Sequence, residues 1–160
     1  HMWSHTYTSA VKDIKMNFKV LHMVQYLCIL AKDGKIKLNP VDSKVTYHDP
    51  CDLGRNSGIY DEPRDLIKMI PGVEFVELEN SREYATCCGG GGNVESIDTE
   101  LSANIASIKA KEIIATGADI VTTACQQCVR TIATALKKEK SRVKAIDISQ
   151  LILDSIKAGS

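Results

Sequence analysis

Residues 118–136 read ADIVTTACQQCVRTIATAL, and this stretch decides the fold class. Its first part, 118–124, is a short apolar and β-branched run, which predicts a buried strand. After Cys125 the apolar side chains recur at three- and four-residue steps, a spacing that predicts a helix. A strand that leads directly into a helix is part of a βαβ unit, and such units build parallel sheets. Cys125 is therefore expected at the carboxyl end of a strand.

The same alternation extends over the rest of the chain. Short β-rich runs predict further strands at 45–48, 73–78 and 143–148. Helical apolar spacing predicts helices at 13–31, 62–70, 98–116 and from 149 onwards. We therefore expect one α/β domain over residues 3–160, with its core in 20–156, built on a parallel sheet with helices on both faces.

Some finer predictions concern the helices. Asp61 and Ser149 are expected to cap two of the helices at their N-termini. The helix over 98–116 is expected to bury one apolar stripe, formed by Leu101, Ile105, Ile108 and Ala115. Cys28 lies on the apolar stripe of the first helix, so we expect it to be a small core residue.

The composition excludes several classes of protein. Hydrophobic residues make up 44% of the 160, and 20 basic residues balance 20 acidic ones, which excludes a disordered chain and a strongly basic nucleic-acid binder. No apolar run reaches the roughly eighteen residues of a membrane span, and no secretory signal opens the chain. We expect a cytoplasmic protein without a nucleic-acid partner or direct membrane insertion. His1-Met2 is typical of a tag remnant, so the natural sequence is expected to begin near Trp3 and to be part of something longer.

Five of the six cysteines form the pattern C-x35-C-C-x36-C-x2-C. They are Cys51, Cys87, Cys88, Cys125 and Cys128. Each group follows a predicted strand, and the carboxyl ends of parallel strands lie along one edge of a sheet, where ligands bind. We therefore expect the five thiols to converge on one metal site at that edge.

Four interpretations of these thiols compete. Structural disulfides are disfavoured in a reducing compartment, and adjacent cysteines pair only with strain. A tetrahedral zinc site often uses a C-x-x-C pair but leaves the fifth thiol unexplained. A thioredoxin-like dithiol at Cys125 and Cys128, at a helix N-terminus, ignores the other three. An iron–sulfur cluster takes soft thiolates, and bridging sulfur makes an odd number of them sensible, so the count favours iron.

Four glycines, Gly89, Gly90, Gly91 and Gly92, directly follow the cysteine pair. Consecutive glycines are costly in chain entropy unless the backbone must approach something closely. One interpretation is a flexible surface loop. The other is a cradle whose amides donate hydrogen bonds to an anionic cofactor, with some glycines at positive φ or too close to sulfur for a Cβ. Their position beside the cysteines favours the cradle.

Three further residues near Cys51 are candidates for specific roles. His48 has the chemistry to donate a proton to a leaving thiolate or to bind zinc in place of a cysteine, or it makes a structural hydrogen bond. Arg55 either faces a substrate carboxylate or sulfonate or lies in a solvated loop. Asp49 is expected to cap the turn before Cys51 with its carboxylate.

Segments 47–55, 87–92 and 124–128 together resemble the cysteine-rich CCG domain of heterodisulfide reductase catalytic subunits and related Fe–S oxidoreductases. The resemblance extends from about Val20 to Ile156. It implies that the five motif cysteines ligate a noncubane 4Fe–4S cluster at which a disulfide is cleaved.

The resemblance also bears on partners. Many family members carry a second motif or a ferredoxin-like module, whereas this chain has one motif. Electrons are therefore expected from an Fe–S module or subunit outside this chain. The isolated chain is expected to be inactive. Any association with a membrane complex is expected to run through a partner subunit. Some isolated domains of the family resemble this one and bind zinc, so a zinc-stabilised structural or protein-interaction module remains the alternative.

Overall fold

The computed structural model describes residues 19–159, and its centre is a sheet of four parallel strands. The sheet order is β2-β1-β3-β4. The strands are β1 (Ser43–Tyr47), β2 (Val73–Val76), β3 (Ile120–Thr123) and β4 (Lys144–Asp147). All three neighbouring pairs are parallel, which confirms the predicted sheet. The predicted tag remnant at 1–2 lies outside the described residues.

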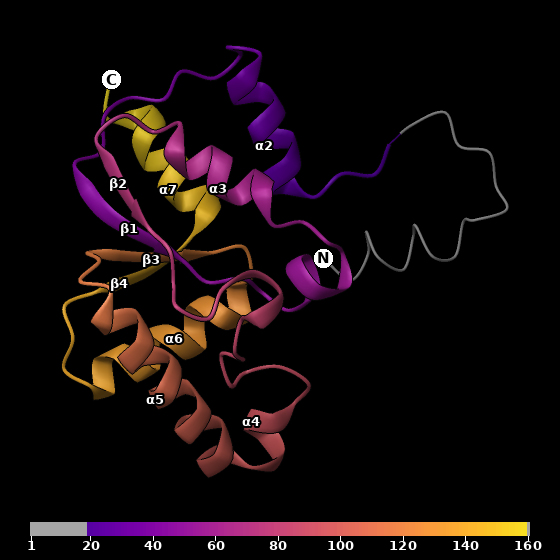
Figure 1. Cartoon of the computed structure of the whole chain (residues 1–160), viewed down its shortest axis with the longest axis vertical. Helices are drawn as coiled ribbons and strands as arrows, with labels where there is room; N and C mark the ends of the chain where they lie inside the picture. Colours follow the sequence, from indigo (N-terminus) through magenta and orange to yellow (C-terminus); the bar gives the residue numbers. More distant parts are fainter. Residues whose placement is uncertain (1–18, 160) are drawn as a thin grey trace, which may run out of the picture.

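Helices cover both faces of the sheet, as predicted (Figure 1). One face carries α2 (Met23–Lys32), α3 (Asp61–Lys68) and α7 (Ile148–Lys157). The other carries α5 (Thr99–Ala115) and α6 (Gln126–Lys138), with the short α4 (Val94–Ile97) beside α5. A π-helical turn (Asp52–Asn56) and a 3-10 turn (Arg82–Tyr84) lie in the connecting loops. Within residues 19–159, no helix is both long and apolar enough to cross a bilayer.

Strand residues alternate between two cores. Val45 and Tyr47 of β1 pack with buried side chains of α2, α3 and α7. Val121 of β3 packs on the opposite face with Ile113 of α5 and Ile132 of α6. All of these side chains are at most 1% exposed. Full burial of such side chains stabilises the fold by about 1.5–3 kcal/mol each. Both cores pack on the same sheet, so the two layers form a single domain.

The sheet order reverses between β1 and β3. From β1 the chain crosses to β2 on one side, and from β3 it crosses to β4 on the other. Loops that leave two adjacent parallel strands in opposite directions open a crevice at their carboxyl ends. Cys51 lies in the loop after β1, and Cys125 and Cys128 lie after β3, at the start of α6, so this reversal determines where the site lies.

Two predicted helix caps are wrong, and so is the part of the first predicted helix that covers residues 19–22. Residues 13–18 of the first predicted helix lie outside the described residues, and 19–22 are not helical. α2 begins at Met23 because His22 caps it: the amide of Val24 donates to His22 Nδ1 at 3.2 Å. Asp61 is the first residue of α3 and not its cap. Asp147, and not Ser149, caps α7, because its carboxylate accepts from the Ser149 amide at 2.9 Å.

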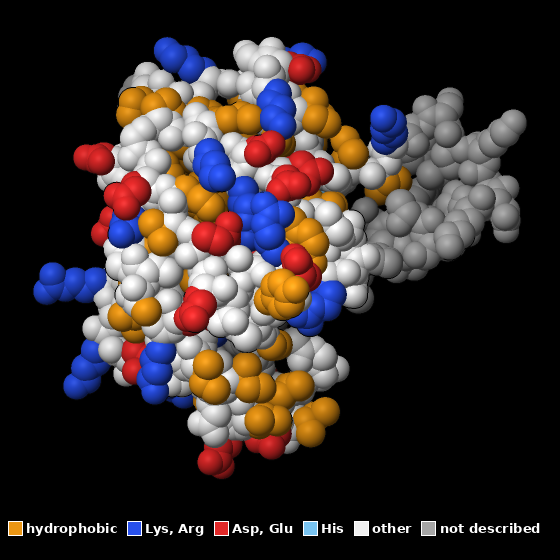
Figure 2. Space-filling view, in the orientation of Figure 1, with side chains coloured by type: hydrophobic (Ala, Val, Ile, Leu, Met, Phe, Trp, Pro, Cys, Tyr) orange, Lys and Arg blue, Asp and Glu red, His pale blue; other side chains and the backbone are white. Residues whose placement is uncertain are grey.

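The predicted buried stripe of α5 is also wrong. Leu101 is 48% exposed and Ile108 66% exposed, and Figure 2 shows apolar side chains gathered at the surface over α4 and α5. The face that packs inward carries mainly small residues, and its buried members are Ser102, Ala106, Lys109, Ala110 and Ile113. The glycine loop runs close to this face: a Cβ on Gly89 would lie 2.5 Å from the Ser102 carbonyl oxygen.

Candidate metal centre

The first cysteine of the pattern lies just beyond β1. Pro50 has no N–H and ends the strand ladder. The chain then turns through a π-helical turn closed by the amide of Asn56, which donates to the Cys51 carbonyl at 3.1 Å. This turn leaves Cys51 exposed, while His48 and Asp49 before it are 2% and 3% exposed.

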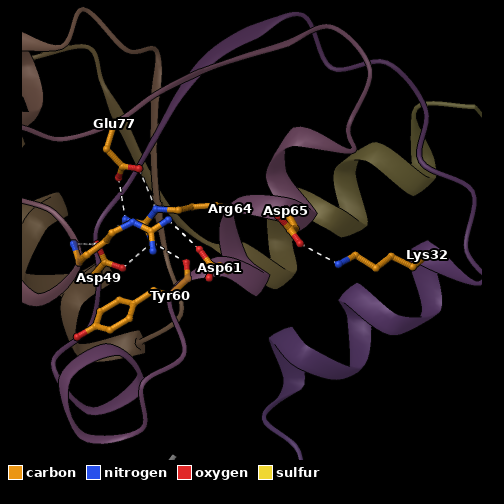
Figure 3. Close-up of polar contacts among 8 residues, drawn as sticks. Lys32, Asp49, Tyr60, Asp61, Arg64, Asp65 and Glu77 are labelled. Atoms are coloured by element: carbon orange, nitrogen blue, oxygen red, sulfur yellow. Dashed lines mark hydrogen bonds and ion pairs between the residues drawn. The ribbon is translucent and has the colours of Figure 1, made fainter.

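Asp49 does not cap the turn before Cys51, contrary to the prediction. Its carboxylate instead accepts two hydrogen bonds from Arg64 of α3, at 2.8 and 2.7 Å (Figure 3). Arg64 also donates twice to Glu77, at 2.8 and 2.7 Å. Burial alone would lower the pKa of Arg64, but the hydrogen bonds to these two carboxylates raise it above its ordinary value. A buried carboxylate requires such a partner, and no sequence pattern connects residues so far apart.

The cysteine pair and the glycines form a tight loop. Gly89 has φ +86° and donates its amide to Cys87 Sγ at 3.3 Å, and the Gly90 amide donates to the Cys88 sulfur. Gly92 also has positive φ, at +62°. Backbone amides therefore point at two of the sulfurs. These contacts fit the cradle better than a flexible loop.

The remaining glycines differ from one another. A Cβ on Gly90 would lie 2.2 Å from Thr131 Oγ1 and 2.6 Å from Gln127 Nε2, so α6 packs directly on this glycine. A Cβ on Gly91 would meet nothing within 4 Å. The close approach at Gly90 is therefore to α6 side chains, whereas Gly91 faces open space at the cavity wall.

The last two cysteines belong to the start of α6. Cys125 is the N-cap residue, and Cys128 is buried in the first turn. Hydrogen bonds from the Cys128 thiol and from the amides of Cys128 and Gln127 lower the pKa of Cys125 to about 6. The unsatisfied amides of a helix N-terminus favour thiolate in this way.

All five motif cysteines line a single cavity of about 180 Å³, together with His48. Three of the donors, His48, Cys88 and Cys128, are buried and lie within 4.8 Å of one another. Cys28 lies elsewhere, 2% exposed in the core with α2 and α3, which confirms it as a core residue. All six cysteines are free thiols. The fold thus brings together residues from three separate loops.

The sulfurs share protons. Hydrogen bonds from Cys128 and Cys87, and then from His48, lower the pKa of Cys88. Conversely, Cys88 raises the pKa of Cys87, and Cys125 and Cys88 raise that of Cys128. Cys88 and Cys125 therefore carry thiolate character, with the Cys87 and Cys128 thiols as donors. Because metals bind thiolates, metal binding here is expected to release the shared protons.

The residues present fit a thiolate-bound metal group. The donors are an odd number of soft sulfurs, which suits irons bridged by sulfide. Amides of the glycine loop already donate to two of these sulfurs. His48 is buried beside these sulfurs and hydrogen-bonds to Cys88, so it adds a nitrogen to the donor set.

The outer wall of the cavity is cationic and polar. Arg55 lines it, and its guanidinium donates to the carbonyls of Glu83 and Ala85, at 3.1 Å each. Among residues 19–159, no carboxylate forms an ion pair with Arg55, which leaves its charge available to a ligand. Arg82 and Gln127 line the same wall and carried no sequence signal, apart from the position of Gln127 inside the C-x-x-C motif.

Comparison with known proteins gives concordant results. The family model for the CCG cysteine-rich domain matches residues 45–133. One component of the dihydromethanophenazine:CoB--CoM heterodisulfide reductase of Methanosarcina barkeri is 36% identical over 143 residues, which are 89% of this chain and 35% of that protein. The probable iron-sulfur-binding oxidoreductase FadF of Bacillus subtilis is 33% identical over 147 residues, 90% of this chain and 21% of FadF.

A third relative is a component of the fumarate reductase (CoM/CoB) of Methanothermobacter marburgensis. It is 38% identical over 138 residues, which are 86% of this chain and 27% of that protein. The chain therefore spans about a third or less of the length of these relatives.

Proposed function

Since this chain belongs to the CCG family of cysteine-rich domains, we propose that it is the iron–sulfur-binding domain of a heterodisulfide reductase-like oxidoreductase. The observation that carries the proposal is the convergence of all five motif cysteines on one cavity. The names of the relatives, which are oxidoreductases and include a component of a heterodisulfide reductase, support the same chemistry.

The proposed ligands are the five motif thiolates, Cys51, Cys87, Cys88, Cys125 and Cys128. Following the family resemblance, the group they hold is a noncubane 4Fe–4S cluster. When bound, it would pass electrons from a donor to a disulfide substrate. The loop from Gly89 to Gly92 cradles it, because its amides already donate to Cys87 and Cys88.

Two proposed roles fall to other residues of the cavity. Reduction of a disulfide to two thiols consumes two electrons and two protons. His48, buried and hydrogen-bonded to Cys88, donates one of these protons to a leaving thiolate. Arg55 orients the substrate through a carboxylate or sulfonate, because its charge has no carboxylate partner among the described residues.

The electrons come from a partner. The pattern supplies ligands for one cluster, and the remaining cysteine, Cys28, is buried in the core away from the cavity. An Fe–S module or subunit outside this chain is therefore the proposed donor, and the isolated chain is expected to be inactive with a physiological donor. Any membrane association would run through such a partner subunit.

A zinc-binding structural or interaction module is the second candidate, and one observation favours it. His48, Cys88 and Cys128 lie within 4.8 Å of one another, and Cys125 lines the same cavity. Four nitrogen and sulfur donors suffice for a tetrahedral zinc site.

Anaerobic production in a host that assembles iron–sulfur clusters separates the two candidates. Iron, acid-labile sulfide and zinc are then measured per chain, and the oxidised, thiol-treated protein is examined by electron paramagnetic resonance. We expect about four irons and four sulfides per chain, as in other 4Fe–4S proteins. Stoichiometric zinc without iron would refute the oxidoreductase proposal.

A further inference from the structure

Helix α5 holds a buried lysine that the proposed function does not use. The Lys109 side chain is 0% exposed, and its Nζ lies 2.6 Å from Oε2 of Glu112, one turn along the helix. The Glu112 side chain is itself only 11% exposed. Removing a charge from water is costly, so each member of this pair requires the other.

Glu112 also binds the segment that leads into the metal centre. We call residues 80–86 the strap, because it runs from the loop after β2 directly into Cys87. The Asn80 amide donates to Glu112 Oε1 at 2.8 Å, and Thr86 Oγ1 lies 3.4 Å from Oε2. Burial raises the pKa of Glu112, but hydrogen bonds from Lys109 and Asn80 outweigh this and lower it overall. An ionised carboxylate thus accepts from both ends of the strap.

The strap is held on its other side by the segment that carries Cys51. The Arg82 amide donates to Asp49 at 2.8 Å. Arg55 donates to two strap carbonyls. Glu112 therefore fixes the strap to α5, and the segment that carries Cys51 binds the strap from the other side. Cys87 follows directly after the last residue of the strap.

We propose that Glu112 is a positioning residue for Cys87: with Lys109 beside it, it ties both ends of the strap to α5 and fixes Cys87 before metal binds. The inference rests on the proposed function, because Cys87 is a ligand only there. Ligands placed in advance by hydrogen bonds outside the coordination sphere bind metal more tightly, because less freedom is lost on binding.

Two matched double variants test this role. Both variants carry Lys109→Met, and they differ at position 112, where one has Glu112→Gln and the other Glu112→Met. Each removes the two charges together, so neither leaves an unpaired buried ion. Their side chains are unbranched and similar in length. They differ in that the glutamine carbonyl can still accept from the Asn80 amide, whereas methionine cannot. Lys111→Met, on the exposed side of α5, is the control for a lost charge on this helix.

The first measurement is the affinity for Co²⁺, followed through thiolate-to-cobalt absorption in competition with a chelator. We expect the double variant with Glu112→Met to lose about 10–100-fold in affinity, as for other groups outside the coordination sphere. The double variant with Glu112→Gln and the Lys111→Met control are expected to match the unsubstituted chain. Equal affinity in both double variants would overturn the proposal.

A Cys87→Ser background tests whether the effect acts through Cys87. There the difference in affinity between the two double variants is expected to vanish, because no ligand remains at that position for Glu112 to place. A difference that persisted would mean that Glu112 stabilises the domain in general, and would overturn the positioning role.

Hydrogen exchange of the metal-free protein gives a readout without metal. In the variant with Glu112→Met, amides of 79–88 are expected to exchange about tenfold faster, whereas Glu112→Gln leaves them unchanged. Equal exchange would show that Glu112 does not hold the strap. An unsubstituted chain that bound no Co²⁺ would count against the proposed function, while the exchange comparison would still decide whether Glu112 holds the strap.

Discussion

Arg64 holds Asp49 through two hydrogen bonds, from Nη1 to Oδ1 at 2.8 Å and from Nη2 to Oδ2 at 2.7 Å, and both side chains are 2% exposed. Asp49 lies two positions before Cys51. The pair therefore connects α3 to the segment that carries the first cysteine. Support for the metal centre reaches beyond the loops that contain its thiols.

Replacement of Arg64 by Met is expected to lower the free energy of unfolding by about 3–5 kcal/mol, because it leaves the Asp49 charge buried without a counter-ion. Urea unfolding of the metal-free protein measures this change. Lys32→Met is the control: it breaks an exposed ion pair with Asp65, for which a much smaller loss is expected because solvent screens the two charges. Equal losses in the two variants would contradict the structure.

Loss of Cys51 is expected to convert the centre. Cys51 is brought in by β1, whereas the other four thiols remain in the cavity and could still hold zinc in a tetrahedral arrangement. Cys51→Ser should therefore lose the native paramagnetic signal and iron but retain zinc binding. Cys28→Ser should change neither, because Cys28 lies in the core. The reverse pattern would show that the ligand assignment is wrong.

The glycine loop is expected to respond differently at two adjacent positions. Valine at either Gly90 or Gly91 is predicted from the sequence to weaken metal binding more than the fold. The structure alters this for Gly90, where any side chain collides with Thr131 and Gln127 and should lower the melting temperature of the metal-free protein. Gly91→Val should leave that melting temperature unchanged and reduce metal content. Full metal content in Gly91→Val would contradict the cradle at this residue and favour the flexible surface loop.

Two of the isoleucines of α5, Ile108 and Ile113, offer a test of its orientation. Ile113 is 0% exposed, so Ile113→Ala should cost about 2–5 kcal/mol of unfolding free energy. Ile108 is 66% exposed, so Ile108→Ala should change it by no more than about 0.5 kcal/mol. Chemical denaturation of both variants measures the contrast. A larger loss of unfolding free energy in Ile108→Ala than in Ile113→Ala would support the buried stripe predicted from the sequence.

The thiols of the metal-free protein should titrate at different pH values. The pKa of Cys125 is lowered to about 6, so its thiolate predominates above that pH and is lost as the pH falls through it. Its alkylation by iodoacetamide should reach half its maximal rate near pH 6. Burial raises the pKa of Cys28, which should react slowly throughout. Mass spectrometry of each cysteine-containing peptide over a pH series measures the alkylation rates of Cys125 and Cys28. A half-maximal rate for Cys125 at a pH near an ordinary thiol pKa would contradict the effect of the helix N-terminus.

The sequence was sufficient for the order of strands and helices. Alternating strand and helix periods predicted the parallel sheet, and the cysteines at strand ends predicted where the site lies. Contacts between distant residues had no such pattern: Arg64 meets Asp49, and Glu112 meets Asn80, only after the chain has folded. The orientation of α5 was missed for a related reason. Its inward face packs against the loop at Gly89, while the apolar side chains of Leu101 and Ile108 are exposed, and the apolar spacing alone did not show this.

The placement of the thiols on three separate loops also determines an order of events during protein synthesis. Cys51, Cys87 and Cys88 leave the ribosome well before Cys125 and Cys128, and the cavity exists only once β1 has paired with β3. Such non-local pairing is slow compared with the formation of single helices. In a nascent chain, three of the five motif thiols are thus exposed to oxidation or to the wrong metal before the site is complete. On the proposed function, delivery of the cluster has to wait until α6 has emerged and docked.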